Sequence, residues 1–299
     1  MTETSQTPAP DGVQNNNPEL WLGRFPWPTA ETHKHSRGRM GVVSGELWMT
    51  GAARMAARAG LRIGAGVVRL FCRDETFMLN AAHAEAVILK RYATDADLEA
   101  AGHELDSMVI GPGAGVNEDT RDNVFALART GAAMVIDADA ITAFRSDPQE
   151  LFSFLDRDDV LTPHEGEFER LFPGALGAGK DRTQAVKEAA AQAQAIVLLK
   201  GSVTLIAAPD GRTAINRAGS PWLATSGSGD VLAGFIGGLM AQGMDSFEAA
   251  CAGVWIHAQC AESFGPGLIA EDLPEQAPAV LRQLWERAGR GMPEGPSEG

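Results

Sequence analysis

A glycine-rich loop that runs directly into an apolar helix is the segment best suited to chemistry. Residues Ala224–Gly234 read ATSGSGDVLAG. Glycines at positions 227 and 229 allow backbone N–H groups to approach an anion, and the N-terminus of the following helix adds partial positive charge there. Asp230 falls in the first turn, where a carboxylate can take a proton from a hydroxyl that attacks phosphorus. The segment predicts phosphoryl transfer, with helix capping by Asp230 as the structural alternative.

A second segment, Val197–Thr204, reads VLLKGSVT and places Lys200, Gly201 and Ser202 directly after an apolar strand. Open α/β sheets bind ligands at the carboxyl ends of their parallel strands. The Lys, Ser and Thr side chains suit the phosphate or ribose of a nucleotide. We interpret the segment from Lys200 to Thr204, which includes Val203, as a nucleotide-binding segment. The alternative is that Lys200 is a solvated lysine in an ordinary loop.

A third glycine-rich segment, Ile110–Gly115, follows another apolar strand and reads IGPGAG. It is not a Walker loop, because no Gly-Lys-Ser/Thr follows it. It also fails the G-x-G-x-x-G pattern, because Val116 occupies the last position, so a Rossmann dinucleotide site is disfavoured. Gly113 and Gly115 either line a ligand or form a tight turn.

Three further groups carry polar residues at strand ends. His164, in LTPHEGEF, either donates to a ligand or has a structural role. Asp137 and Asp139, in IDADA, either hold Mg²⁺ through water or cap a helix. The basic cluster at residues 33–39 is either a ligand contact or a solvated charge run, and no residue set has the spacing of a direct metal site.

The elements that must position these residues alternate between short apolar runs and Ala-rich helical stretches. Expected strands lie at 41–43, 67–71, 86–89, 108–110, 133–136, 160–161 and 196–199, and expected helices at 51–63, 119–129, 183–194, 229–241, 246–264 and 278–287. This alternation predicts an α/β fold with a mostly parallel central sheet and helices on both faces, in three layers. Residues 203–207 and 213–216 interrupt it as an antiparallel hairpin.

Composition narrows the class of protein. The 299 residues carry a net charge of −14, which disfavours nucleic acid and anionic membranes as partners. No window reaches the roughly 18 apolar residues of a membrane span, and the polar start resembles no export signal, so we expect a soluble cytoplasmic protein. The three cysteines are expected to be free buried thiols. One domain is expected at residues 19–289, between loose tails at 1–18 and 290–299.

The order of these motifs resembles the NAD(P)H-hydrate dehydratase family. The similarity rests on the segment from Thr50 to Val67, then GPGAG, IDADA, TPHEGEF, KGSVT and GSGDVLAG, and it covers residues 30–265. The combination of TPHEGEF, KGSVT and GSGDVLAG is specific, whereas each motif alone is not. The family pattern begins with a Lys-Gly pair at the first strand, and this chain departs from it because Lys34 is separated from Gly38.

The resemblance implies a ribokinase-like fold and a lyase that uses ADP or ATP with Mg²⁺. Such an enzyme converts the S-epimer of hydrated NADH or NADPH (NADHX, NADPHX) back to the reduced cofactor. On matching positions, the adenine nucleotide would contact Lys200, Gly201, Ser202, Val203, Thr204 and the loop Gly227, Ser228 and Gly229. The hydrated nicotinamide would contact Asp230, and Ala52 or Ala53, Gly113, Gly115 and His164 would line its side of the site.

Two other functions remain as alternatives. One is a ribokinase-like kinase for a vitamin precursor such as hydroxyethylthiazole or hydroxymethylpyrimidine, which would share the loop and its aspartate. The other is a silent nucleotide-binding regulator, which would not need Asp230. Some family members carry an epimerase domain first, and the stretch before the first expected strand is too short for one. A separate epimerase or spontaneous epimerisation is therefore expected. The resemblance also implies a homo-oligomer, possibly a tetramer.

Overall fold

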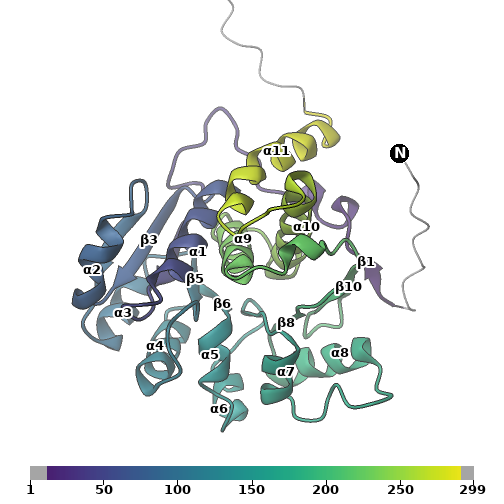
Figure 1. Ribbon diagram of the computed structural model, residues 1–299, viewed down its shortest axis with the longest axis horizontal. Coiled ribbons are helices and arrows are strands. Elements are labelled where there is room, and N and C mark those ends of the chain that lie inside the picture. The colour runs from purple at the N-terminus through teal and green to yellow at the C-terminus, as the bar shows by residue number, and fades with distance from the viewer. Residues whose placement is uncertain (1–11, 291–299) are drawn as a thin grey trace, which may run out of the picture.

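A computed structural model describes residues 12–290, which form one ten-stranded sheet in the order β1-β10-β9-β8-β7-β6-β5-β2-β3-β4 (Figure 1). Its parallel part consists of β2 (Arg39–Val43), β3 (Val67–Cys72), β4 (Ile88–Arg91), β5 (Ser107–Ile110), β6 (Ala133–Ile136), β7 (Val160–Leu161) and β8 (Ile196–Leu199). The hairpin of β9 (Thr204–Ala207) and β10 (Thr213–Asn216) adds to β8 in the antiparallel sense. The predicted parallel sheet with one hairpin is confirmed.

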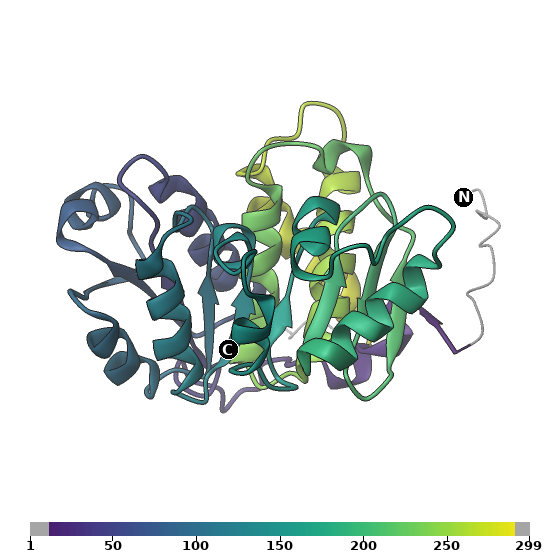
Figure 2. The same ribbon diagram turned by 90° about the horizontal axis from the view of Figure 1, so that it is seen from below.

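Helices cover both faces of the sheet (Figure 2). One layer contains α1 (Thr50–Ile63), α9 (Ser228–Ala241), α10 (Ser246–Phe264) and α11 (Asp272–Arg287). The other contains α3 (Asp95–Gly102), α4 (Glu118–Ala128), α5 (Ala138–Thr142), α6 (Pro148–Phe152), α7 (Glu165–Leu171) and α8 (Arg182–Ala193). The short helix α2 (Asp74–Ala81) packs beside β3 and β4.

Alternate strand residues enter opposite cores, which explains why the strands are apolar on both sides. Val42 and Val109 belong to the core under α1 and α9, whereas Val43 and Met108 belong to the core under α3 and α4. All four side chains are at most 1% exposed. A strand buried on both faces reads as a continuous apolar run, as these do.

Two boundaries differ from the sequence predictions by more than two residues. The expected loose tail 1–18 is wrong in its last part, because β1 (Gln14–Asn15) pairs with β10 and the side chain of Asn16 bonds to Asn216 and to the carbonyl oxygen of Cys251. Residues 1–11 and 291–299 lie outside the described residues. Helix α11 begins six residues before the expected start at Pro278, because buried Leu273 and Ala277 hold its first turns against the core.

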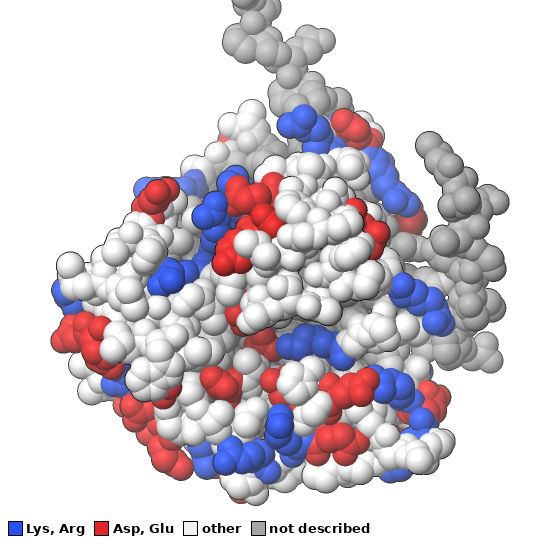
Figure 3. All heavy atoms as spheres, viewed as in Figure 1, with Lys and Arg blue, Asp and Glu red and all other residues white. Residues whose placement is uncertain are grey.

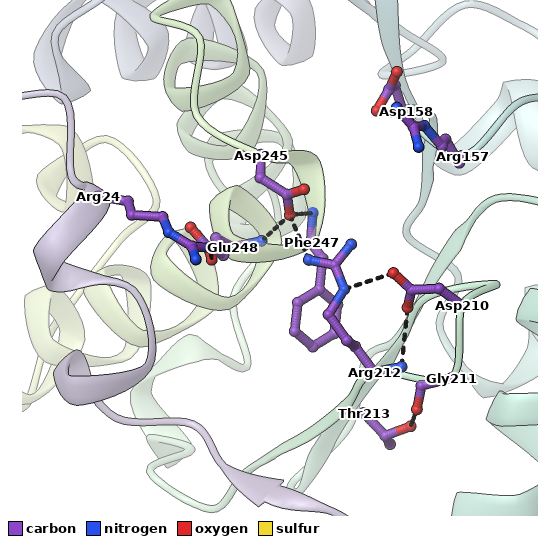
Figure 4. Close-up of polar contacts among 10 residues, drawn as sticks. All are labelled: Arg24, Arg157, Asp158, Asp210, Gly211, Arg212, Thr213, Asp245, Phe247 and Glu248. Atoms are coloured by element: carbon purple, nitrogen blue, oxygen red, sulfur yellow. Dashed lines mark hydrogen bonds and ion pairs between the residues drawn. The ribbon is translucent and has the colours of Figure 1, made fainter.

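A charged cluster fastens the hairpin to the start of α10 (Figure 4). Arg212 Nε lies 2.8 Å from Asp210 Oδ2, and its Nη1 lies 2.9 Å from Asp245 Oδ1. The guanidinium also lies 4.8 Å from the centre of the Phe247 ring. Asp245 also caps α10, so this aspartate joins the hairpin to that helix.

In residues 12–290, no helix combines the length and apolar character needed to cross a membrane. The three cysteines are free and buried, as predicted.

Candidate active site at the carboxyl edge of the sheet

An ion pair between Asp137 and Lys200 forms the base of the candidate site. Asp137 follows β6 and Lys200 follows β8, and the single strand β7 separates them in the sheet. Lys200 Nζ donates to Asp137 Oδ1 at 2.6 Å, and the Asp137 side chain is 1% exposed. The backbone N–H of Lys200 donates to the carbonyl oxygen of Pro163 at 2.8 Å, which fixes the lysine to the end of β7. The pair is therefore held at the edge where parallel sheets bind ligands.

The glycine-rich loop lies directly against this ion pair. Gly227, with φ of +88°, caps α9 in the left-handed region that favours glycine. A side-chain Cβ built at Gly229 would lie 3.6 Å from Lys200 Nζ and 3.9 Å from Asp137 Oδ2. The two glycines thus leave the first N–H groups of α9 accessible beside a lysine ammonium. This combination of helix N-terminus and cation suits a phosphoryl group.

Asp230 lies in the first turn of α9, beside the same pair. Burial raises the pKa of its carboxyl to about 7, and the nearby charge of Asp137 adds to this, whereas Lys200 opposes it. A carboxyl with a pKa near neutrality exists in both forms under physiological conditions. Asp230 can therefore accept a proton and later return it, which is what general acid–base catalysis requires.

Lys200 remains a cation in this environment. Burial lowers the pKa of Lys200, but the charges of Asp137 and Glu167 and the hydrogen bond to Asp137 outweigh burial, so the pKa lies above its ordinary value. For Glu167 the balance differs: burial raises the pKa of its carboxyl, although Lys200 opposes the change. The site thus holds one fixed positive charge among several carboxylates. Figure 3 shows charged side chains of both signs along the hollow that crosses this face of the molecule.

His257, on α10, holds the loop from behind. Its Nε2 lies 2.9 Å from the carbonyl oxygen of Ser228, and because a carbonyl only accepts, Nε2 carries the proton. Burial lowers the pKa of His257 to about 4, so the ring stays neutral near pH 7. The Ser228 hydroxyl donates to the carbonyl oxygen of Leu223 at 2.8 Å. These two bonds fix the backbone just before Gly229 and Asp230.

The GPGAG segment forms a further wall of the site, next to Asp139. The Gly113 carbonyl oxygen accepts from the Glu46 N–H at 3.0 Å, and the Gly115 N–H donates to Asp139 Oδ2 at 3.0 Å. Gly113 and Gly115 have φ of +66° and +85°, and Ala138, between the two aspartates, has φ of +50°. A non-glycine residue in this region is strained, and such strain is typical of functional sites. The contact with Asp139 links this wall to the Asp137 segment.

The other predicted residues lie around this centre, with different accessibility. Ala53 is completely buried in the core, so of the pair Ala52 and Ala53 only half-buried Ala52 can reach a ligand. His164 caps α7: its Nδ1 accepts from the Glu167 N–H at 3.1 Å, and 55% of its side chain is exposed. The structural alternative for His164 is therefore realised, and its exposed ring remains accessible.

The residues predicted to bind the nucleotide differ in their exposure. Gly201 and Ser202 are exposed, Val203 is half-buried and Thr204 is buried. Thr204 Oγ1 lies 3.4 Å from the carbonyl oxygen of Gly201, so its hydroxyl shapes the loop.

Sequence reasoning missed the roles of Glu167 and His257. Glu167 was visible only as an acidic residue at a helix start, yet its charge acts on Lys200. His257 carries no local signal, because a single histidine in an apolar helix is most often a core residue. Among residues 12–290, no cluster of three or more His, Cys, Asp or Glu side chains could hold a metal ion, so Asp137 and Asp139 are available only as partial ligands.

Known proteins resemble this chain over most of its length. An ADP-dependent (S)-NAD(P)H-hydrate dehydratase of Neisseria meningitidis is 35% identical over 274 residues, which cover 88% of this chain and 90% of that protein. Several bifunctional NAD(P)H-hydrate repair enzymes also match, and the chain spans about half of their length.

Among solved structures, an ADP/ATP-dependent NAD(P)H-hydrate dehydratase of Bacillus subtilis, co-crystallized with ATP/Mg²⁺, superposes with a TM-score of 0.77 at 26% identity, covering 92% of this chain and 100% of its own. A ribokinase of Thermotoga maritima, 15% identical, superposes with a TM-score of 0.57 over 82% of this chain and 99% of its own, which shows the predicted ribokinase-like fold. The sequence model of the NAD(P)H-hydrate dehydratase family matches residues 40–277. The chain belongs to the NAD(P)H-hydrate dehydratase family.

Proposed function

We propose that this protein dehydrates the S-epimer of NADHX or NADPHX to NADH or NADPH, with ADP or ATP as the phosphoryl donor. The observation that carries the proposal is the position of Asp230 directly after the Gly227–Gly229 loop, which lies against the Asp137–Lys200 pair. Family membership and the similarity to the Neisseria dehydratase support the choice of substrate. The site therefore combines a base, an anion hole and a fixed cation.

The first step activates a poor leaving group. The hydroxyl on the hydrated nicotinamide ring loses its proton to Asp230 as its oxygen attacks the terminal phosphorus of the nucleotide. The N–H groups at the start of α9 and the Lys200 ammonium stabilise the negative charge on the transferring phosphoryl group. AMP leaves when ADP is the donor, and ADP leaves when ATP is the donor.

The second step removes the phosphate ester. The lone pair of the ring nitrogen forms a double bond to the carbon that carries the ester, and phosphate departs with the bonding electrons. The departed phosphate then accepts a proton from the adjacent ring carbon, and the C–H electrons form the ring double bond that restores the dihydropyridine. The protein needs only to exclude water and hold the ring, because the substrate supplies the electrons for this step.

Mg²⁺ fits the site as an ion that arrives with the nucleotide. It commonly keeps several waters and binds through one or two carboxylates together with substrate phosphates. Asp137, which lies against the loop, and Asp139, which accepts from the Gly115 N–H, would provide such carboxylates. When bound, the ion would neutralise phosphate charge. Because Asp137 Oδ1 accepts from Lys200, only the second oxygen of Asp137 would be free to help hold the ion.

The direct test adds enzymatically prepared NADHX, ADP and Mg²⁺ and follows the near-ultraviolet absorbance of the reduced nicotinamide. Recovery of that absorbance with release of one phosphate and one AMP per NADH supports the proposal. Phosphorylation of hydroxyethylthiazole or hydroxymethylpyrimidine without such recovery would refute it in favour of a kinase. The expected separate epimerase and the expected homo-oligomer remain predictions.

A further inference from the structure

A cavity of about 650 Å³ runs along α1, outside the catalytic centre. Its walls come from α1, from residues 83–87 ahead of β4, and from Glu271 and Pro274 at the start of α11. The lining extends from Gly51 to Arg62, which is about 16 Å at about 1.5 Å per helical residue. Ligand pockets span about 300–1,000 Å³, so the volume suits a nucleotide-sized group.

One end of this cavity adjoins the candidate active site. Gly51 lines the cavity and directly precedes Ala52, the residue available to the substrate. Met55 also lines it, and a Cβ built at Gly227 would lie 3.0 Å from Met55 Sδ. Met55 therefore separates the cavity from the glycine loop by the thickness of one side chain. A long ligand whose reactive end lies at Asp230 can continue past Ala52 into this space.

The charge of the cavity favours an anion at that end. Arg54, Arg58 and Arg62 recur every fourth residue and so share one face of α1. Glu275 forms ion pairs with Arg58 and Arg62. Arg54 donates to the Thr50 hydroxyl at 2.8 Å, and within residues 12–290 no carboxylate forms an ion pair with it. In a protein with a net charge of −14, this half-buried guanidinium beside the active site is available to a phosphate.

We propose that the cavity binds the adenosine-phosphate half of the dinucleotide substrate, with Arg54 contacting its bridging phosphates. This inference rests on the proposed function, which supplies the dinucleotide. The reactive ring then lies at Asp230, the phosphates lie at the Gly51 end, and the adenosine lies toward Ala86 and Leu61. The donor nucleotide occupies the separate Lys200 segment.

The test compares the full hydrate with a truncated one. Equilibrium binding of NADHX and of hydrated reduced nicotinamide mononucleotide is measured by calorimetry, and turnover of both is followed with ADP. Ala86→Trp fills the adenosine end of the cavity, and Ala82→Trp adds the same side chain to the same segment outside the lining. We expect Ala86→Trp to weaken NADHX binding about tenfold or more and to leave mononucleotide binding unchanged. Ala82→Trp should affect neither ligand.

Arg54 has its own pair of variants. Arg54→Gln should weaken NADHX binding about tenfold without changing the KM for ADP, and Arg54→Lys should recover part of the loss because it keeps the charge. Equal binding of the two hydrates by the unmodified protein, or equal effects of Ala86→Trp on both, overturns the inference. Tighter binding of NADHX without its turnover overturns the proposed function alone. Binding of neither hydrate overturns both.

Discussion

Replacing Asp230 by Asn should stabilise the protein at the pH where the site is active. Burial and the charge of Asp137 raise the pKa of Asp230 to about 7, from 3.8. A carboxyl with a raised pKa binds its proton more tightly in the folded state than in the unfolded state. Ionising it therefore costs stability, and this cost grows as the pH rises from 3.8 and levels off above about 7. Asparagine keeps the shape and carries no charge.

The size of the effect follows from the same pKa. Each pKa unit corresponds to about 1.4 kcal/mol, so full ionisation of Asp230 lowers the free energy of unfolding by at most about 4 kcal/mol. About 2.6 kcal/mol of this loss develops between about pH 5 and about pH 8. Asp230 is half-buried, so solvent screens its charge and the change in stability is smaller than the pKa alone implies. We therefore expect a net gain of about 1 kcal/mol over that range.

The assay is urea unfolding of both proteins at about pH 5 and about pH 8. His257, whose pKa is lowered to about 4, makes both proteins less stable as the pH falls below 6.5, and this contribution cancels in the difference. The stability of Asp230→Asn relative to the unmodified protein should rise with pH. A difference that is constant, or that falls with pH, would show that the Asp230 carboxyl is not destabilised by its surroundings.

Three further predictions address the site and the scaffold. Because Asp230 must be ionised to act as a base, log kcat/KM should fall below pH 7 with a slope of one. Asp137→Asn should shift this fall to lower pH, since Asp137 raises the pKa of Asp230. A fall that does not shift would mean that another group titrates. His257→Phe leaves the Ser228 carbonyl without its donor, so the KM for ADP should rise several-fold and the free energy of unfolding should fall by about 1–3 kcal/mol. An unchanged KM would show that His257 does not position the glycine loop. Arg212→Ala breaks two exposed ion pairs and should cost about 1 kcal/mol in urea unfolding without changing KM; a loss of several kcal/mol would contradict the exposed geometry.

Local sequence patterns were sufficient to predict the strand ends and the loop that carry the site. The Gly227–Asp230 loop and the Lys200 segment each combine a small-residue turn with a strand or helix boundary, and such features depend on a few neighbouring residues. Apolar runs buried on both faces likewise predicted the parallel sheet. Only the structure shows which of these strand ends lie next to one another.

Long-range pairing was not predictable from the same patterns. Asp137 and Lys200 are 63 residues apart, and their contact depends on β7 inserting between β6 and β8. The two residues of β1 are too few to show any periodicity, so their segment resembled a tail. Pro278 suggested a helix start because proline lacks the N–H that a helix interior needs, yet the packing of α11 outweighs that loss.

The role of Asp230 as the base is tested most directly by measuring turnover and nucleotide affinity together in Asp230→Asn. We predict that NADHX turnover with ADP and Mg²⁺ falls about 10²–10⁴-fold, since general-base catalysis contributes that much, while calorimetry gives an unchanged Kd for ADP. Turnover near that of the unmodified protein, with ADP still bound, would contradict it.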